Sequence, residues 1–287
     1  MVFLGGILNT VVPKLLPRFD HVVMTQFSDQ LLTPEDRMRD YYRRSYSRMP
    51  GYFYPEHFME VPYWIPIVSS MLPPEMFMRE LFVVTDMQMA RQRMEQSDRG
   101  TVFVFSVLDA NLDFVLDLAE TGAWILAGGY VDPRLFERFR NVTWLDRPED
   151  ILSLLPGSRP GVALDYQLFD GVECIARYSL STGCSFKCAF CTVPSKLTLA
   201  DPAQVRAETN ALRPLRFDLI FMDDKSFGDA SNWRSIGTVR SAVQEFNPNF
   251  GGFIVQTPPS LAAKGGFREM TTPRPSLGSS GTPTSFP

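Results

Sequence analysis

The chain has 287 residues, of which 45% are hydrophobic and 21% are charged. This is an ordinary globular composition, with enough chain for one large domain or two smaller ones. The formal net charge of -4 gives no sign of the basic surface that binding to a phosphate backbone requires, so we expect no nucleic-acid partner. No stretch approaches the roughly 20 apolar residues that span a bilayer, and the apolar start lacks the features of a secretory signal. We expect a cytoplasmic protein without a membrane span.

The middle of the chain alternates β-rich runs with amphipathic segments, which favours βα units and a mostly parallel sheet. Residues 101–107 are typical of a strand, and residues 109–121 have the apolar spacing of a helix with one buried face. Residues 124–127 form a second predicted strand, which ends at Gly128 and Gly129. A glycine pair at this point allows either a tight turn or the close approach of a ligand, and no complete GxGxxG motif follows to decide between them.

A weak internal repeat supports two such units. Residues 13–22 align without gaps to residues 133–142, and each copy follows a glycine pair. Each copy would place a proline-led helix between two strands, with chance similarity as the alternative. We therefore predict a Rossmann-like N-terminal domain over residues 1–165, within which residues 33–100 show too little periodicity to assign.

A second α/β region follows. Its predicted elements alternate in the order of the opening half of a βα barrel, and we place this partial barrel over residues 170–265. The elements are a strand at 174–180, a helix at 202–212, a strand at 217–222, a helix at 233–246 and a strand at 253–256. In the last segment, residues 266–287, 15 of the residues are Ser, Thr, Pro or Gly, which predicts disorder.

The strongest chemical signal is the C-x3-C-x2-C motif formed by Cys184, Cys188 and Cys191. Three thiolates in one short loop can hold three irons of a [4Fe–4S] cluster and leave the fourth iron open for a ligand. Structural zinc would need four ligands, and Cys174 lies in a predicted strand. Zinc stays an alternative, as does a metal-free cluster of thiols, which would be an oxidation liability. The clustering also favours a metal site in a reducing compartment over disulfides.

This loop, with an aromatic residue before its third cysteine and a strand ahead of it, resembles the radical S-adenosylmethionine superfamily. The resemblance implies that the three cysteines ligate a [4Fe–4S] cluster whose open iron chelates S-adenosylmethionine. One-electron reduction would then cleave this cofactor to a 5′-deoxyadenosyl radical that acts on a small organic substrate. The expected electron donor is a flavodoxin or ferredoxin. Phe190 would lie near the adenine, or else in the core.

The same family places polar residues, often Gly-Gly-Glu, at the end of the second barrel strand, where they meet the methionine moiety. The matching stretch here contains Asp223 and Asp224, so the resemblance implies that these carboxylates accept hydrogen bonds from the cofactor ammonium. Capping the turn before the next helix is the alternative for Asp224. Gln256, at the end of the third strand, is a further candidate because polar residues at strand ends in such barrels often face the site.

The Asp-Asp pair and the Rossmann-like domain ahead of the barrel also resemble the family members that carry a cobalamin-binding domain. The Asp-x-His-x-x-Gly run that supplies an axial ligand in some cobalamin proteins is missing, since neither His21 nor His57 stands in such a run. Many relatives with this domain order lack that histidine. Cobalamin therefore stays open as an additional cofactor.

The predicted barrel portion holds about three βα units, whereas the family's partial barrel has about six. Three parallel strands leave an open edge that needs covering. We interpret the chain as a truncated or frame-shifted product, or as a naturally short protein that completes its barrel through another chain. The leading expectation is a radical S-adenosylmethionine enzyme or a fragment of one. The alternatives are a non-catalytic iron–sulfur protein and a zinc-stabilised Rossmann-like binding module.

Overall fold

A computed structural model describes residues 18–32, 61–189, 196–225, 227 and 232–257. Two compact units divide the described residues between them. The first unit contains residues 18–32 and 64–168, and the second contains residues 61–63 and the described residues from 169 onward. The predicted disordered tail, residues 266–287, and the first copy of the internal repeat up to residue 17 lie outside the described residues.

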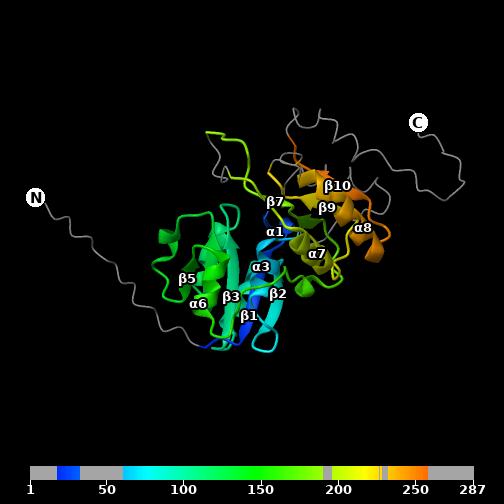
Figure 1. Ribbon diagram of the computed structural model, residues 1–287. Helices are drawn as coiled ribbons and strands as arrows, with labels where there is room; N and C mark the ends of the chain where they lie inside the picture. The colour runs from blue at the N-terminus through cyan, green and yellow to red at the C-terminus, as the bar shows by residue number, and fades with distance from the viewer. Residues whose placement is uncertain (1–17, 33–60, 190–195, 226, 228–231, 258–287) are drawn as a thin grey trace, which may run out of the picture. The chain divides into compact units, whose positions relative to one another are not determined.

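The first unit is built on a five-stranded parallel sheet with the strand order β2-β1-β3-β4-β5 (Figure 1). Its strands are β1 (His21–Phe27), β2 (Met78–Val84), β3 (Thr101–Val107), β4 (Trp124–Gly129) and β5 (Val142–Leu145). This is a doubly wound order, in which the direction of strand addition reverses between β1 and β3. The predicted α/β class and the Rossmann-like character of this region are confirmed.

The central strands are mostly apolar. Six of the seven residues of β3 are buried, as expected for a parallel strand that is covered on both faces and so reads as a continuous hydrophobic run. In this core, the rings of Phe27 and Phe105 lie 5.9 Å apart, and both residues are at most 2% exposed. Removal of such a buried ring costs about 3–5 kcal/mol. This core fixes the positions of the strand ends.

Short helices lie between the strands of this unit and after its last strand. They are α1 (Asp29–Leu32), α3 (Trp64–Ser70), α4 (Met87–Glu95), α5 (Leu112–Ala119), η1 (Pro133–Phe136), η2 (Pro148–Asp150) and α6 (Ile151–Leu154). The helix predicted at 109–121 is confirmed as α5, which buries Val115, Leu118 and Ala119. The proline-led helix of the second repeat copy is a single 3-10 turn, η1, which Asp132 caps by accepting from the Arg134 amide.

The second unit contains a three-stranded parallel sheet in the order β10-β9-β6. Its elements are η3 (Gln167–Phe169), β6 (Ala176–Tyr178), β7 (Ser181–Thr182), β8 (Thr198–Leu199), α7 (Pro202–Ala211), β9 (Leu219–Met222), η4 (Asn232–Ser235), α8 (Ile236–Phe246) and β10 (Gly252–Val255). The predicted succession of strand, loop, helix, strand, helix and strand is present. A βα barrel that includes these strands stays a prediction.

The first strand of this sheet is shorter than predicted, three residues instead of the seven of 174–180. Its amino-terminal side leaves the ladder because the Cys174 amide donates to the carbonyl of Arg216, outside the named strands. On the other side, the Leu180 amide donates to a side chain, Asp224, and not to a neighbouring strand. Both differences arise from long-range partners that periodicity does not reveal.

Tyr178 joins the strand β6 to the helix α7. Its hydroxyl donates to the carbonyl of Val205 at 2.8 Å and lies 3.1 Å from the hydroxyl of Thr209. Burial raises the pKa of Tyr178, which therefore stays a neutral hydrogen-bond donor. The helix itself begins after Asp201, whose carboxylate accepts from the amides of Ala203 and Gln204. The helix that follows the cysteine loop is therefore fixed both at its start and along its inner face.

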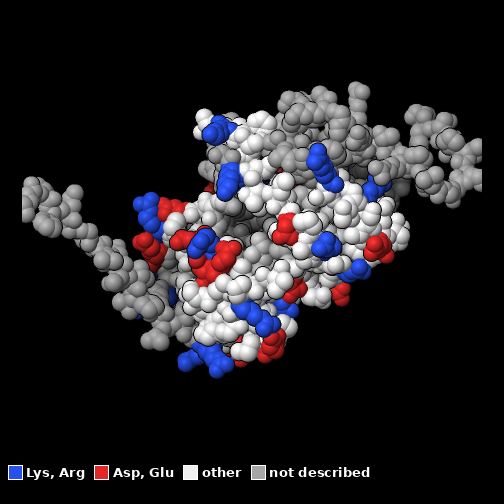
Figure 2. Space-filling view, viewed as in Figure 1, with Lys and Arg blue, Asp and Glu red and all other residues white. Residues whose placement is uncertain are grey.

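Charged side chains of both signs are interspersed over the described part of the face in Figure 2. Ion pairs such as Arg91–Asp117 and Arg138–Glu120 join opposite charges at the surface of the first unit. Within the part of the chain that the structure describes, no helix combines the length and the apolar character needed to cross a membrane.

Candidate functional site

The cysteine loop leaves the carboxyl end of β6 and is closed at its base by a short antiparallel ribbon. Ser181 pairs with Leu199 and Thr182 pairs with Thr198, while the amide of Ala200 donates to the carbonyl of Leu180. Gly183 then adopts a φ of 81°, a left-handed conformation that glycine tolerates best. The loop is thus held at both of its ends, and it turns directly before its first cysteine.

Two of the three predicted ligands lie in the described part of this loop. Cys184 is half-buried and Cys188 is exposed, and both carry free thiols. Cys191 and Phe190 lie outside the described residues. Among the residues that are described, no three His, Cys, Asp or Glu side chains come together as a metal-binding group. The donor chemistry fits an iron–sulfur cluster, because thiolates are its protein ligands, and the three-cysteine ligand set stays a prediction.

Cys174 differs sharply from the loop cysteines. It is 5% exposed, and burial raises the pKa of its thiol from 9.0 to about 12. A thiol with this pKa stays protonated at neutral pH, whereas metal ligation and nucleophilic attack require the thiolate. The structure therefore describes Cys174 as a core residue, in agreement with its exclusion from the predicted ligand set.

Asp224 lies two residues beyond the end of β9 and is completely buried, with an exposed fraction of 0%. One carboxylate oxygen, Oδ2, accepts from the amide of Leu180 at 3.0 Å, and the other, Oδ1, accepts from the hydroxyl of Ser181. The side chain thus reaches back to the stem of the cysteine loop, 43 and 44 residues earlier in the chain. The expected roles of Asp224 were a cofactor contact and a turn cap, and neither of them involves these two partners.

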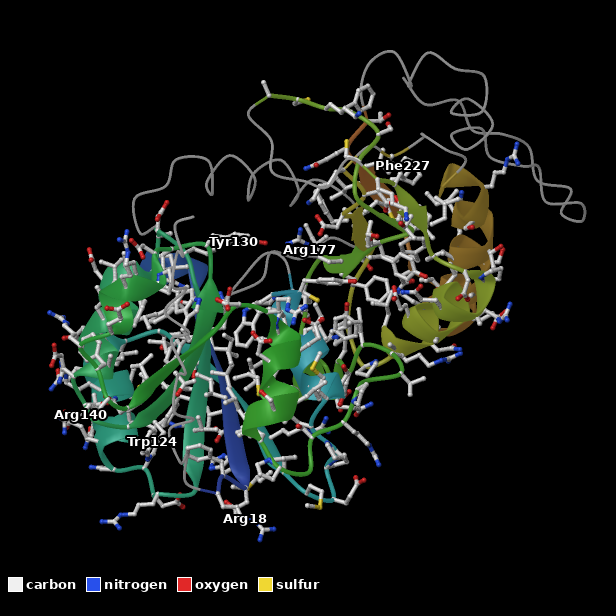
Figure 3. The ribbon with its side chains drawn as sticks, turned by 60° about the vertical axis from the view of Figure 1, so that its left-hand side comes forward. Arg18, Trp124, Tyr130, Arg140, Arg177 and Phe227 are labelled. Carbon is white, nitrogen blue, oxygen red and sulfur yellow. The ribbon has the colours of Figure 1, made fainter. Side chains whose placement is uncertain are left out.

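The neighbouring carboxylate, Asp223, is partly exposed and engaged by two cations. Its Oδ1 accepts from Arg177 Nη2 and from Lys225 Nζ, each at 2.7 Å. Its amide donates to the carbonyl of Tyr178 and continues the ladder between β6 and β9. The Arg177 guanidinium, labelled in Figure 3, lies 5.5 Å from the centre of the Phe221 ring. These contacts already supply positive partners to the carboxylate that the resemblance assigns to the cofactor.

Gln256 follows β10 and is exposed. The backbone carbonyl of Gln256 accepts from the amide of Phe227 at 3.1 Å. The hydroxyl of Thr257 donates to the backbone carbonyl of Phe227 at 2.7 Å. Phe227, labelled in Figure 3, is fully buried. The loop after β9 is thereby tied to the end of β10. Three of the predicted residues, Asp223, Asp224 and Gln256, thus lie at the carboxyl edge of one parallel sheet.

A small depression of about 160 Å³ adjoins the loop stem. Its lining includes Ser179, Thr182 and Thr198, together with Tyr63 and Glu208. Burial raises the pKa of both Tyr63 and Glu208, and a hydrogen bond from Gln204 partly opposes the effect on Glu208. The volume is below the range of about 300–1,000 Å³ that is typical of ligand pockets. Tyr63 stands in the segment that sequence periodicity left unassigned, and no motif marks it.

The carboxyl edge of the five-stranded sheet is the second place where a ligand is expected, because doubly wound sheets bind ligands beyond their strand ends at the point of reversal. Tyr130, directly after β4, is 92% exposed and Leu108, directly after β3, is 44% exposed. Figure 3 shows Tyr130 and Trp124 at opposite ends of the sheet. Gly129 has a φ of 147°, and a Cβ atom there would lie 2.0 Å from the carbonyl oxygen of Val107. The close approach of backbone thus accounts for this glycine.

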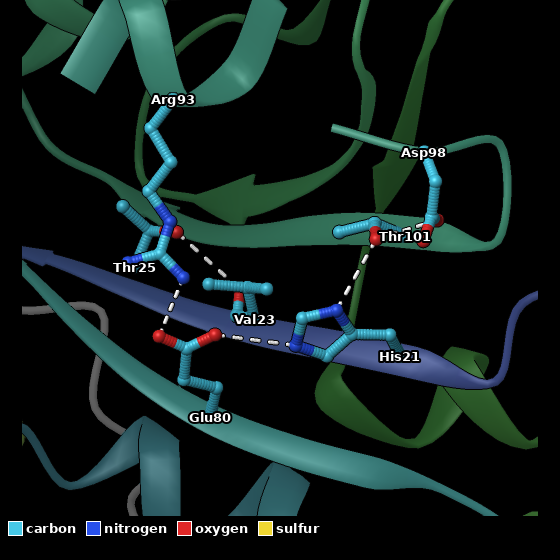
Figure 4. Close-up of polar contacts among 7 residues, drawn as sticks. All are labelled: His21, Val23, Thr25, Glu80, Arg93, Asp98 and Thr101. Atoms are coloured by element: carbon cyan, nitrogen blue, oxygen red, sulfur yellow. Dashed lines mark hydrogen bonds and ion pairs between the residues drawn. The ribbon is translucent and has the colours of Figure 1, made fainter. Parts of the chain in front are cut away.

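At the opposite, amino-terminal edge, His21 is engaged on both ring nitrogens (Figure 4). Its Nε2 lies 3.2 Å from Glu80 Oε2, and its Nδ1 lies 3.2 Å from the hydroxyl of Thr101. Arg93 pairs with the other oxygen of Glu80, and Asp98 accepts from Thr101. The network joins the starts of β1, β2 and β3, away from the ligand-binding edge of such a sheet. His57 lies outside the described residues.

No protein-family model matches the chain, and no curated protein matches it significantly.

Proposed function

We propose that this chain is a radical S-adenosylmethionine enzyme, or part of one, that holds a [4Fe–4S] cluster through Cys184, Cys188 and Cys191. The observation that carries the proposal is the C-x3-C-x2-C motif on a loop that leaves the carboxyl end of a parallel strand. When bound, such a cluster supplies the electron that cleaves S-adenosylmethionine and so begins radical chemistry on an organic substrate. An electron donor of the flavodoxin or ferredoxin class belongs to the same proposal.

The arrangement of the strands supports this proposal. Active sites of βα barrels lie at the carboxyl ends of their strands, and the cysteine loop leaves β6 at that edge. The adjacent strands β9 and β10 bring Asp223 and Gln256 to the same edge. The chain order and the spatial order of these three strands are those with which such a barrel begins, and we propose that they are its first three strands.

The residues at this edge have chemistry suited to the amino-acid end of the cofactor. Asp223 is partly exposed, and its carboxylate can accept a hydrogen bond from an ammonium group. The exposed amide side chain of Gln256 can donate to a carboxylate or accept from an ammonium. Phe190 belongs to the proposal as the residue beside the adenine.

Cobalamin is a second proposed cofactor, and the first unit supplies the observation that favours it. Tyr130 and Leu108 expose apolar surface at the carboxyl edge of the doubly wound sheet, where an extended ring system can pack. His21 does not serve as an axial ligand in this proposal, since its partners lie at the opposite edge. Hydroxocobalamin added to the full chain should change the absorbance spectrum of the corrin ring, with weaker binding to Tyr130→Ala. An unchanged spectrum at saturating corrin would remove cobalamin from the proposal.

Anaerobic reconstitution of the full chain with iron and sulfide tests the main proposal. We expect a brown protein with about four irons per chain, whose reduced electron paramagnetic resonance spectrum changes when S-adenosylmethionine is added. A cluster that is indifferent to S-adenosylmethionine would favour a non-catalytic iron–sulfur protein. A colourless protein that retains zinc would favour the zinc-stabilised binding module.

A further inference from the structure

We infer that Asp224 is a positioning residue that sets the stem of the cysteine loop, and not a ligand of the cofactor ammonium. The link from this loop to a cluster rests on the proposed function. The anchoring of the loop by the carboxylate is independent of it.

Burial and hydrogen bonding carry the inference. The three residues that meet, Asp224, Leu180 and Ser181, are 0%, 2% and 5% exposed. One oxygen of the carboxylate accepts a hydrogen bond from the Leu180 amide, and the other accepts one from the Ser181 hydroxyl. A buried amide that loses its acceptor carries the full cost of its desolvation. By accepting from this amide, Asp224 stabilises the path of the loop stem.

The ribbon at the base of the loop is too small to do this alone. It consists of two residue pairs, and both residues of β8 are exposed. An isolated two-stranded hairpin is marginally stable in water. Asp224 fixes the inner side of the stem, so the ribbon and the carboxylate together determine where the chain turns at Gly183. Cys184, the first proposed ligand, follows that turn directly.

Anchoring of the loop stem and binding of the cofactor ammonium predict opposite results for Asp224→Asn, which replaces the carboxylate by an amide of the same shape. Anchoring requires hydrogen bonding but no charge. In Asp224→Asn, the amide oxygen can still accept from Leu180, and the amide nitrogen can donate to Ser181, because a hydroxyl accepts as readily as it donates. Asp224→Ala removes both bonds. A carboxylate that held the cofactor ammonium would instead lose affinity for S-adenosylmethionine in Asp224→Asn while the loop stayed in place.

Hydrogen–deuterium exchange of the metal-free full chain measures the anchoring without the cluster. We expect the amide of Leu180 to exchange at least about tenfold faster in Asp224→Ala, with a smaller rise in Ser181→Ala and rates near wild type in Asp224→Asn. Asp223→Asn is the matched control and should leave this amide protected. Unchanged protection in Asp224→Ala would overturn the inference, whatever the iron content.

Iron content and cofactor binding after reconstitution complete the test. We expect Asp224→Ala to retain less than about half of the wild-type iron, and Asp224→Asn to retain nearly all of it and to bind S-adenosylmethionine normally. If Asp224→Ala does not fold, Asp224→Asn and Ser181→Ala carry the test. An Asp224→Asn protein with full iron, a protected Leu180 amide and weakened cofactor binding would overturn the positioning role. Wild-type protein without iron would refute the proposed function but leave the exchange result valid.

Discussion

Alkylation of Cys174 is a quantitative test of the difference between this cysteine and the loop cysteines. Burial raises the pKa of Cys174 from 9.0 to about 12, and only the thiolate reacts at a useful rate. Three pKa units reduce the thiolate fraction at pH 8 by about a thousandfold, before any steric protection is counted. We therefore expect iodoacetamide to modify Cys174 at least about a thousandfold more slowly in the native protein than in the same protein unfolded in denaturant.

Quenched labelling followed by peptide mass spectrometry gives the rate for each cysteine separately. In the metal-free protein, exposed Cys188 serves as the internal control, since its accessible thiol should react far faster than the buried thiol of Cys174. The rate at Cys174 should keep rising with pH through the alkaline range, because its thiol ionises only near pH 12. Native labelling of Cys174 within about tenfold of its rate in denaturant would refute the reasoning.

Two further predictions concern the second unit. Tyr178→Phe removes a buried hydroxyl, while Thr209 keeps its own 2.7 Å hydrogen bond to the carbonyl of Val205. The free energy of unfolding, measured with denaturant, should therefore fall by about 1 kcal/mol. A fall of more than about 3 kcal/mol would contradict this account. Burial raises the pKa of Glu208, so the folded state binds its proton more tightly than the unfolded state, and stability falls as pH rises through the raised pKa. Glu208→Gln should flatten this decline and be the more stable protein at neutral pH, and an unchanged pH profile would contradict the assignment.

The sequence predicted those elements whose signal is local. The strand at residues 101–107 has nearly every side chain buried, so a run of Val and Phe was enough to identify it. The strand β2 was missed because it lies at the sheet edge, where Arg79 and Glu80 interrupt the apolar pattern. The helix α4 was missed because only Ala90 and Met94 are buried along it. Edge elements need fewer apolar residues, and their periodicity is correspondingly weak.

The site shows the same division between local and long-range information. The cysteine spacing is a local pattern, and so it identified the loop directly. The partners of Asp224 could not be predicted, because the bonds to Leu180 and Ser181 join residues more than 40 positions apart. Tyr63 reaches the depression beside the loop stem from a segment without periodicity. Residues that position a loop from a distant strand end become visible only in the folded chain.

The iron content of three reconstituted proteins tests the central claim most directly. The full chain and its Cys188→Ala and Cys174→Ala variants are reconstituted anaerobically side by side, and iron is measured per chain. We predict about four irons in the wild type, nearly the same in Cys174→Ala, and loss of the cluster in Cys188→Ala. Equal iron in the wild type and in Cys188→Ala would contradict the assignment of the cysteine loop as the cluster site.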